Sequence, residues 1–276
     1  YQPQPSMVRD SVCFIYCLMI SAAVVVVLGM AIYGSMVTFW PWNKALTLNN
    51  YNFAEMSTYG WTPFFNSLTL GAWAAVIGTL LIFLGAYGIE KGRAFAPIRQ
   101  VMQMLSVVPM AVPGMVLGLG YIFYFNDLNN PLNFLYGTMT FLVINTVVHY
   151  YTVGHMTALT ALKQLPAEIE ATAASVNLPQ YKLFFKVTVP VCLPAILDIA
   201  TYLFINALTT TSAVVFLYST DTIPASVSVL NMDDAGQTGA AAAMAVMIML
   251  SAASAKVVHL VINKLFEKRT QAWRKR

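Results

Sequence analysis

The sequence predicts an all-α, polytopic membrane protein with six transmembrane helices. Of its 276 residues, 58% are apolar and only 9% are charged, a composition that an ordinary water-soluble domain of this length does not need for its core. The apolar residues fall into segments that are long enough to cross about 30 Å of hydrocarbon, for which a helix needs roughly 20 residues. Basic residues gather in alternate connections between these segments, as they do in membrane proteins.

The predicted spans cover residues 13–39, 65–87, 98–125, 136–158, 191–218 and 240–262. The third and fifth spans contain internal prolines and polar residues. Their ends are therefore defined only to within several residues, and one of the two spans can be broken rather than continuous.

Charge placement orients the spans, because short cytoplasmic loops retain Lys and Arg. One side carries Arg9, Lys91, Arg93, Arg99, Lys163, Lys182, Lys186, Lys256, Lys264, Lys268, Arg269, Arg274, Lys275 and Arg276; the other carries Lys44, Glu55, Asp127, Asp221, Asp233 and Asp234. We therefore expect both termini in the cytoplasm, with a linker at 1–11, a six-helix membrane domain at 12–262 that includes a cytoplasmic loop at 159–190, and a basic tail at 263–276. The net charge of +4 reflects this bias and favours contact with lipid, not with nucleic acid.

The first residue is Tyr rather than Met, and the opening YQPQPS is typical of a flexible linker. We therefore expect a part of a longer polypeptide or a processed chain. Cys13, Cys17 and Cys192 lie in or beside predicted spans and are interpreted as small packing residues, so no metal site is predicted.

The third span contains the run SVVPMAVPGMVLGLG, in which Pro109 and Pro113 are four residues apart and Gly114 follows directly. Such a pattern kinks a helix and lets a neighbouring helix approach closely. The run predicts a hinge or a part of a transport pathway, and plain helix packing remains the alternative.

The fifth span carries most of the polar groups predicted inside the membrane. A hydroxyl-rich helix can line a polar passage or bond to other helices and to its own carbonyls. Asp198 near the cytoplasmic end of this span is an intramembrane acid, for which we expect a gating or structural role rather than substrate binding, because it repels an anion. The pathway candidates are Asn206, Thr209, Thr210, Thr211 and Ser212.

A polar insert, EIEATAASVNLPQYKLFFKVTVP at residues 168–190, separates the fourth and fifth spans. Pro166 can open a helix whose positive end favours Glu168 and Glu170, and Asn177 can end that helix in the left-handed conformation. Pro179 then starts a second helix, and the residues that follow it are too apolar for a free loop. The insert predicts a docking surface for a soluble partner, with a helix lying on lipid as the alternative.

The sequence lacks a phosphate-binding pattern of the GxxxxGK[ST] type, so we expect another protein to hydrolyse any nucleotide. At this point the insert resembles the cytoplasmic loop of permease subunits of bacterial binding-protein-dependent ABC importers, with the motif E-A-A, three residues, G, and a later Leu-Pro pair. Ala171, Thr172 and Ala173 follow Glu170, Asn177 stands at the glycine place, and Val189 and Pro190 close the motif at the spacing of the family. At the position where the family motif has its Glu, this chain has Ala171, and Glu170 stands one residue before that position.

The resemblance implies the fold of a type I ABC importer permease in the bacterial inner membrane, which pairs with a second permease half, identical, different or fused. It also implies two cytoplasmic ATPase subunits that hold ATP and Mg, and a periplasmic solute-binding protein, so this chain has no cofactor or catalytic residue of its own. The residues implied to contact the ATPase are Glu168, Glu170, Ala171, Ala173, Ser175, Asn177, Pro179, Tyr181 and Pro190, and Asp233 and Asp234 are the candidates that face the binding protein.

The segment from Asn206 through STDTIPASVSVLNMDDAGQTGAAAAMAV resembles the second half of permeases for 2-aminoethylphosphonate. This solute is therefore the first substrate hypothesis, and ferric iron, thiamine, polyamines and phosphate-like anions are the alternatives that the wider group implies. A secondary transporter driven by an ion gradient would use Asp198 and the Pro-Gly run, but it leaves the insert unexplained. A membrane-embedded enzyme has less support, because no catalytic set of residues occurs at a suitable spacing.

Overall fold

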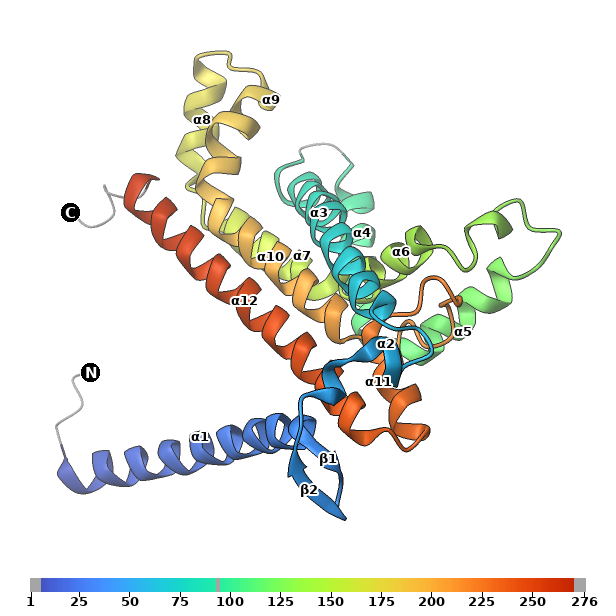
Figure 1. The fold of residues 1–276 in the computed structure, drawn as a ribbon. Coiled ribbons are helices and arrows are strands. Elements are labelled where there is room, and N and C mark those ends of the chain that lie inside the picture. The colour runs from blue at the N-terminus through green and yellow to red at the C-terminus, as the bar shows by residue number, and fades with distance from the viewer. Residues whose placement is uncertain (1–5, 93–94, 271–276) are drawn as a thin grey trace. The chain divides into compact units, whose positions relative to one another are not determined.

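The computed structural model describes residues 6–92 and 95–270 of the chain (Figure 1). The predicted basic residues Arg93, Arg274, Lys275 and Arg276 lie outside these ranges, as do residues 1–5 of the predicted linker. The chain forms two compact units, one made of residues 1–60 and 229–247 and the other of residues 61–228 and 248–276.

The first unit begins with the apolar helix α1 (Met7–Met36), which starts inside the segment predicted as a linker. The helix ends before residue 39 because β1 (Val37–Phe39) pairs antiparallel with β2 (Asn43–Leu46) in a short hairpin that was not predicted. The other described elements are helices, which confirms the all-α prediction. The short helices η1 (Asn49–Tyr51) and α2 (Phe53–Met56) follow. Buried Asn50 fixes this junction by donating to the carbonyls of Ser35 and Val37 at 2.9 and 2.8 Å.

The remaining elements lie in the second unit, except that the last two helices are shared between the two units. They are α3 (Thr62–Lys91), α4 (Ala96–Ala111), α5 (Gly114–Phe125), η2 (Asn133–Leu135), α6 (Met139–His149), α7 (Tyr151–Lys163), α8 (Ala167–Ser175), α9 (Gln180–Leu183), the π-helical turn Phe184–Thr188, α10 (Val189–Thr209), α11 (Ala225–Asp234) and α12 (Thr238–Thr270). The helix α3 packs most extensively against α10 and next against α7 (Figure 1).

Glycines allow these three helices to approach closely. A Cβ atom added to Gly71 would lie 3.0 Å from the ring of Phe204, and one added to Gly78 would lie 2.6 Å from Leu203. On α7, a Cβ at Gly154 would lie 2.9 Å from Ile82 of α3. Small residues at helix interfaces are typical of membrane bundles, where close packing replaces the hydrophobic effect as the source of association.

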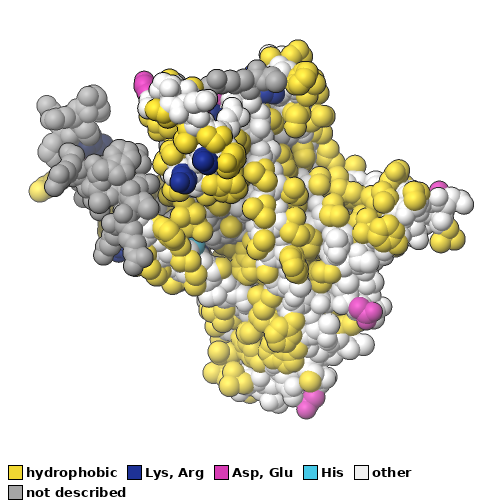
Figure 2. Space-filling model, turned by 90° about the horizontal axis from the view of Figure 1, so that it is seen from above, with side chains coloured by type: hydrophobic (Ala, Val, Ile, Leu, Met, Phe, Trp, Pro, Cys, Tyr) yellow, Lys and Arg dark blue, Asp and Glu magenta, His cyan; other side chains and the backbone are white. Residues whose placement is uncertain are grey.

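Four helices of the described residues are long and apolar enough to cross a membrane: Met7–Met36, Thr62–Lys91, Gln180–Thr209 and Thr238–Phe266. The pair formed by α4 and α5 adds a fifth if it counts as one span, although the two helices are bent by 107° at residues 112 and 113. The prediction that one proline-containing span is broken is therefore confirmed for the third. Apolar side chains cover much of the face seen in Figure 2, as lipid contact requires.

The six predicted spans are not all reproduced as single helices. The fourth is divided at Tyr150 into α6, which has only 11 residues, and α7, which extends to Lys163. The fifth was predicted to reach residue 218, but α10 ends at Thr209 because Thr210 takes an extended conformation with φ −67° and ψ 130°. Three consecutive threonines have low helix propensity, which the apolar composition of the segment concealed.

Candidate coupling loop and polar pathway

The helix α8 forms where the sequence predicts it, from local signals at both of its ends. Pro166 stands at its N-cap, and Glu168 and Glu170 lie in its first turn, where the helix dipole favours negative charge. Asn177 ends the helix with a φ of 50°. The amide of Leu178 then donates to the carbonyl of Ala173 at 2.9 Å, which is the bond of a Schellman motif.

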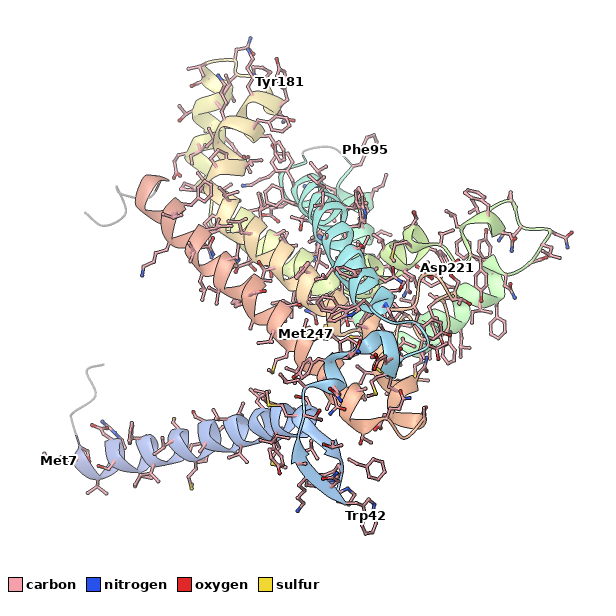
Figure 3. All side chains as sticks on the ribbon, in the orientation of Figure 1. Met7, Trp42, Phe95, Tyr181, Asp221 and Met247 are labelled. Carbon is pink, nitrogen blue, oxygen red and sulfur yellow. The ribbon has the colours of Figure 1, made fainter. Side chains whose placement is uncertain are left out.

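The second helix of the loop, α9, begins directly after Pro179, as predicted. It continues through the π-helical turn into α10, whose first turn contains Pro190. Tyr181 lies at the outer end of this α8–α9 hairpin, with its ring directed away from the other helices (Figure 3). The residues between α7 and α10 therefore form an ordered hairpin rather than a flexible connection.

The hairpin exposes large apolar side chains in its turn and near the start of the apolar helix Gln180–Thr209. We call this set the loop apolar face; it consists of Val176, Leu178, Tyr181 and Phe185. On α8, Ala173 is buried while Ala171 and Ser175 are exposed, and the Ser175 hydroxyl donates to the carbonyl of Thr172 at 2.8 Å. Exposed apolar patches of this kind mark sites of contact with a protein or a membrane.

The two glutamates of α8 differ in their surroundings. Glu168 is exposed, whereas Glu170 forms an ion pair with Lys91 at the end of α3, with an Oε1 to Nζ distance of 2.7 Å. The resemblance assigned Glu170 to a contact with the ATPase. In the structure its carboxylate is paired within the same chain, and its contact with the ATPase stays a prediction.

The predicted hinge lies where α4 and α5 meet. Pro109 is in the last turn of α4, and Pro113 is the N-cap of α5. A Cβ atom on Gly114 would lie 2.8 Å from the Ser212 hydroxyl, 3.1 Å from the ring of His149 and 3.2 Å from the Ala213 nitrogen. The structure therefore brings Gly114 and Ser212 together, although 98 positions separate them in the sequence.

The other pathway candidates lie at the end of α10 and do not form the hydroxyl-rich helix that was expected. Asn206 and Thr209 bond to carbonyls of their own helix, from Nδ2 to Tyr202 at 2.8 Å and from Oγ1 to Ile205 at 3.1 Å. Thr210, Thr211 and Ser212 follow in irregular backbone. Backbone carbonyls in this segment accept hydrogen bonds from side chains of other segments. The Ser226 hydroxyl donates to the carbonyl of Thr210, and Asn145 Nδ2 donates to the carbonyl of Ala213 at 2.8 Å.

Asp198 lies on the same helix, beside a cavity of about 480 Å³. Its Oδ1 is 3.1 Å from Nε2 of buried His259 on α12, and the Nδ1 of that histidine contacts the Thr201 hydroxyl at 2.9 Å. Lys256 and Asn206 line the same cavity. The cavity therefore carries charged side chains of both signs next to a polar contact between α10 and α12.

Asp233 and Asp234 are exposed at the end of α11, in the first unit. Their predicted contact with a binding protein stays a prediction.

Three residues escaped the sequence analysis as parts of these sites: Lys91, Asn145 and His259. Lys91 served only to orient the chain, and its partner lies 79 positions further on. Asn145 and His259 are polar residues within apolar helices, a signal that marks buried function or structure in membrane proteins. Their partners depend on helix packing.

Residues 84–268 match the family described as "Binding-protein-dependent transport system inner membrane component". The chain therefore belongs to this family, which is one of transport components and not of enzymes. The matched region includes α4 to α10, with the whole α8–α9 hairpin, and most of α12. The chain is a multi-pass protein of the inner membrane and a component of a binding-protein-dependent transport system.

Among curated relatives, the chain is 31% identical over 218 residues to the "Ferric transport system permease protein FbpB" of Actinobacillus pleuropneumoniae, covering 78% of this chain and 31% of that protein. It is also 31% identical over 197 residues to the "Putative ferric transport system permease protein FbpB 1" of Haemophilus influenzae, covering 70% of this chain and 30% of that protein. The chain thus spans about a third of the length of these relatives.

Two solved structures share the fold. One is described as a bacterial ABC transporter involved in the import of the acidic polysaccharide alginate, with a TM-score of 0.73, 15% identity and coverage of 95% of this chain and 97% of that chain. The other is the alginate transporter in complex with an alginate pentasaccharide-bound periplasmic protein, with a TM-score of 0.74, 14% identity and coverage of 95% and 96%. At these identities the likeness concerns the fold alone.

Proposed function

We propose that this chain forms part of the membrane pathway of an ATP-driven importer of ferric iron, which a periplasmic binding protein delivers. Separate cytoplasmic ATPase subunits, which hold ATP and Mg, bind the α8–α9 hairpin, and a second permease half completes the pathway. Both termini lie in the cytoplasm, and Asp233 and Asp234 face the binding protein.

The observation that carries the proposal is the loop apolar face. Val176 and Leu178 stand in the turn between α8 and α9, and Tyr181 and Phe185 stand near the start of the apolar helix Gln180–Thr209; all four side chains are exposed. Lys182 and Lys186 lie within the same hairpin, on the side where basic residues predict the cytoplasm. An apolar centre with a polar rim is typical of a surface that binds another protein.

Iron is preferred because the curated relatives are ferric transport permeases. Asp198 attracts a cation where it would repel an anion, while Lys256 in the same cavity has the opposite effect. Because these two charges have opposite effects, the preference for ferric iron as the substrate rests on the curated relatives. The resemblance to 2-aminoethylphosphonate permeases gives the competing solute for the same pathway.

The test is ATP hydrolysis by the reconstituted transporter, measured with binding proteins loaded with ferric iron, 2-aminoethylphosphonate, thiamine or a polyamine. Stimulation by the iron-loaded protein, with iron uptake into the vesicles, is the expected result. Stimulation by another solute alone would replace the substrate and keep the importer.

The variant Tyr181→Asp tests the hairpin, because it places a charge in the loop apolar face. We expect it to release the ATPase from the purified membrane complex. The control is Leu128→Asp, which places the same charge on a leucine that is even more exposed than Tyr181, in the connection between α5 and η2. If both variants keep the ATPase, or both lose it, the hairpin is not the docking surface.

A further inference from the structure

The ion pair between Lys91 and Glu170 joins two helix ends that the sequence places far apart. The side chains are only 14% and 32% exposed, and their charged atoms are 2.7 Å apart. Lys91 is the last residue of α3, and Glu170 lies in the first turn of α8. Each charge therefore occupies the helix end whose dipole favours its sign, and partial burial shields the pair from screening.

A second contact joins α3 to the far end of the hairpin. Tyr87, one turn before Lys91, packs edge-on against Phe184 with ring centroids 4.7 Å apart, and Phe83 lies 6.0 Å from the same ring. Phe184 is buried in the helix core. One face of α3 thus holds the hairpin both where α8 begins and where α9 ends.

The helix α3 is itself closely interlocked with α10. Gly71 and Gly78 bring it against Phe204 and Leu203, so that even a methyl group would not fit at either glycine without movement. A densely packed interface of this kind moves as a body rather than deforming continuously. Displacement of the hairpin is therefore passed to α3 and α10 together.

We propose that Lys91 is a positioning residue for energy coupling, which fixes α8 to α3 by holding Glu170. On this basis Glu170 acts within the chain, and the surface offered to the ATPase is formed by the loop apolar face and the exposed side of α8. The inference rests on the proposed function, because it assumes that an ATPase binds the hairpin.

Charge exchange tests the pair in the full transporter. Lys91→Glu and Glu170→Lys each place like charges together, and we expect each to lower iron imported per ATP hydrolysed by roughly tenfold while the ATPase stays bound. The double variant Lys91→Glu/Glu170→Lys restores an opposite pair, and we expect it to recover import to within about threefold of the starting protein, since both charges then oppose the helix dipoles.

Two controls change the same charges elsewhere. Lys163→Glu alters an exposed lysine at the end of α7, and Glu168→Lys alters the exposed glutamate two positions before Glu170. Import should not recover when Lys163→Glu is combined with Glu170→Lys, or when Glu168→Lys is combined with Lys91→Glu. Lys91→Arg, which keeps the charge, should import at nearly the original rate.

The inference is overturned if the double variant imports no more iron per ATP than the less active of the two single variants. It is also overturned if Glu170→Lys alone releases the ATPase, because Glu170 would then contact the ATPase directly. Failure of the proposed function is a separate result. In that case the unmodified chain itself would bind no ATPase, or ATP hydrolysis would not respond to any loaded binding protein.

Discussion

The α8–α9 hairpin and the α4–α5 bend are both interruptions between apolar helices, but they are held in different ways. The hairpin takes its shape from neighbours in the sequence, with Asn177 at a φ of 50° and a backbone bond from Leu178 to Ala173. The bend takes its shape from distant segments, because Gly114 lies against Ser212, Ala213 and the ring of His149.

This difference separates two tasks. A hairpin with local order can present a surface and, because α3 holds it at both ends, move together with α3. A bend that is wedged between other helices can change only when those helices rearrange. We therefore expect substitutions on the hairpin to affect coupling and substitutions at the bend to affect both stability and transport.

The largest effect is expected for Gly114→Val. The added side chain would meet the Ala213 nitrogen and the His149 ring, and such overpacking typically costs about 1–3 kcal/mol. Gly120→Val is the control on the same helix, since a Cβ there meets nothing within 4 Å. Thermal unfolding in detergent and iron uptake in vesicles measure the two effects. Equal behaviour of the two variants would contradict the tight packing at the bend.

Asn145→Leu should destabilise the protein by about 1–2 kcal/mol, because it leaves the buried carbonyl of Ala213 without its donor at 2.8 Å. Asn129→Leu, in the exposed connection after α5, is the comparison and should leave the unfolding temperature nearly unchanged. A small change in both variants would show that the segment after α10 does not depend on this bond.

The same difference explains which features could be predicted from the sequence. Pro166, Asn177 and Pro179 act on adjacent residues, so both helices of the hairpin and the turn between them were predictable. The break of the third span was also predictable, from Pro113 and Gly114. What surrounds the break was not, because it depends on how α5, α6 and the end of α10 pack.

Two further features could not be predicted from the sequence: the end of α10 and the ion pair of Glu170. The run after Thr209 is apolar enough to extend a span, and its departure from the helix is stabilised by Asn145 and Ser226, which lie in other segments. Lys91 is one of several lysines that the charge bias places near the same membrane surface. Its pairing with Glu170 needs the register of α3 against the hairpin.

A smaller effect, confined to coupling, is expected at Asn177. A residue with a Cβ pays roughly 1 kcal/mol or more in the left-handed conformation, whereas Gly pays none and Asn little. Asn177→Ala should therefore loosen the turn after α8 and lower the stimulation of ATP hydrolysis, while Asn177→Gly should retain it. Thermal unfolding of the bundle should change little in either variant. A large loss of bundle stability would show that the hairpin is not locally ordered.

The smallest effect is expected for Glu168→Gln. This glutamate is exposed in the first turn of α8, where removal of a negative charge costs about 0.3–1 kcal/mol through the helix dipole. If the ATPase recognises mainly the loop apolar face, its affinity for the variant should fall by less than about fivefold, against its release by Tyr181→Asp. A titration of labelled ATPase measures both. If Glu168→Gln lowered the affinity for the ATPase as much as Tyr181→Asp, the ATPase would also bind the negative charge at the start of α8. The hairpin would then contact its partner at two separate places.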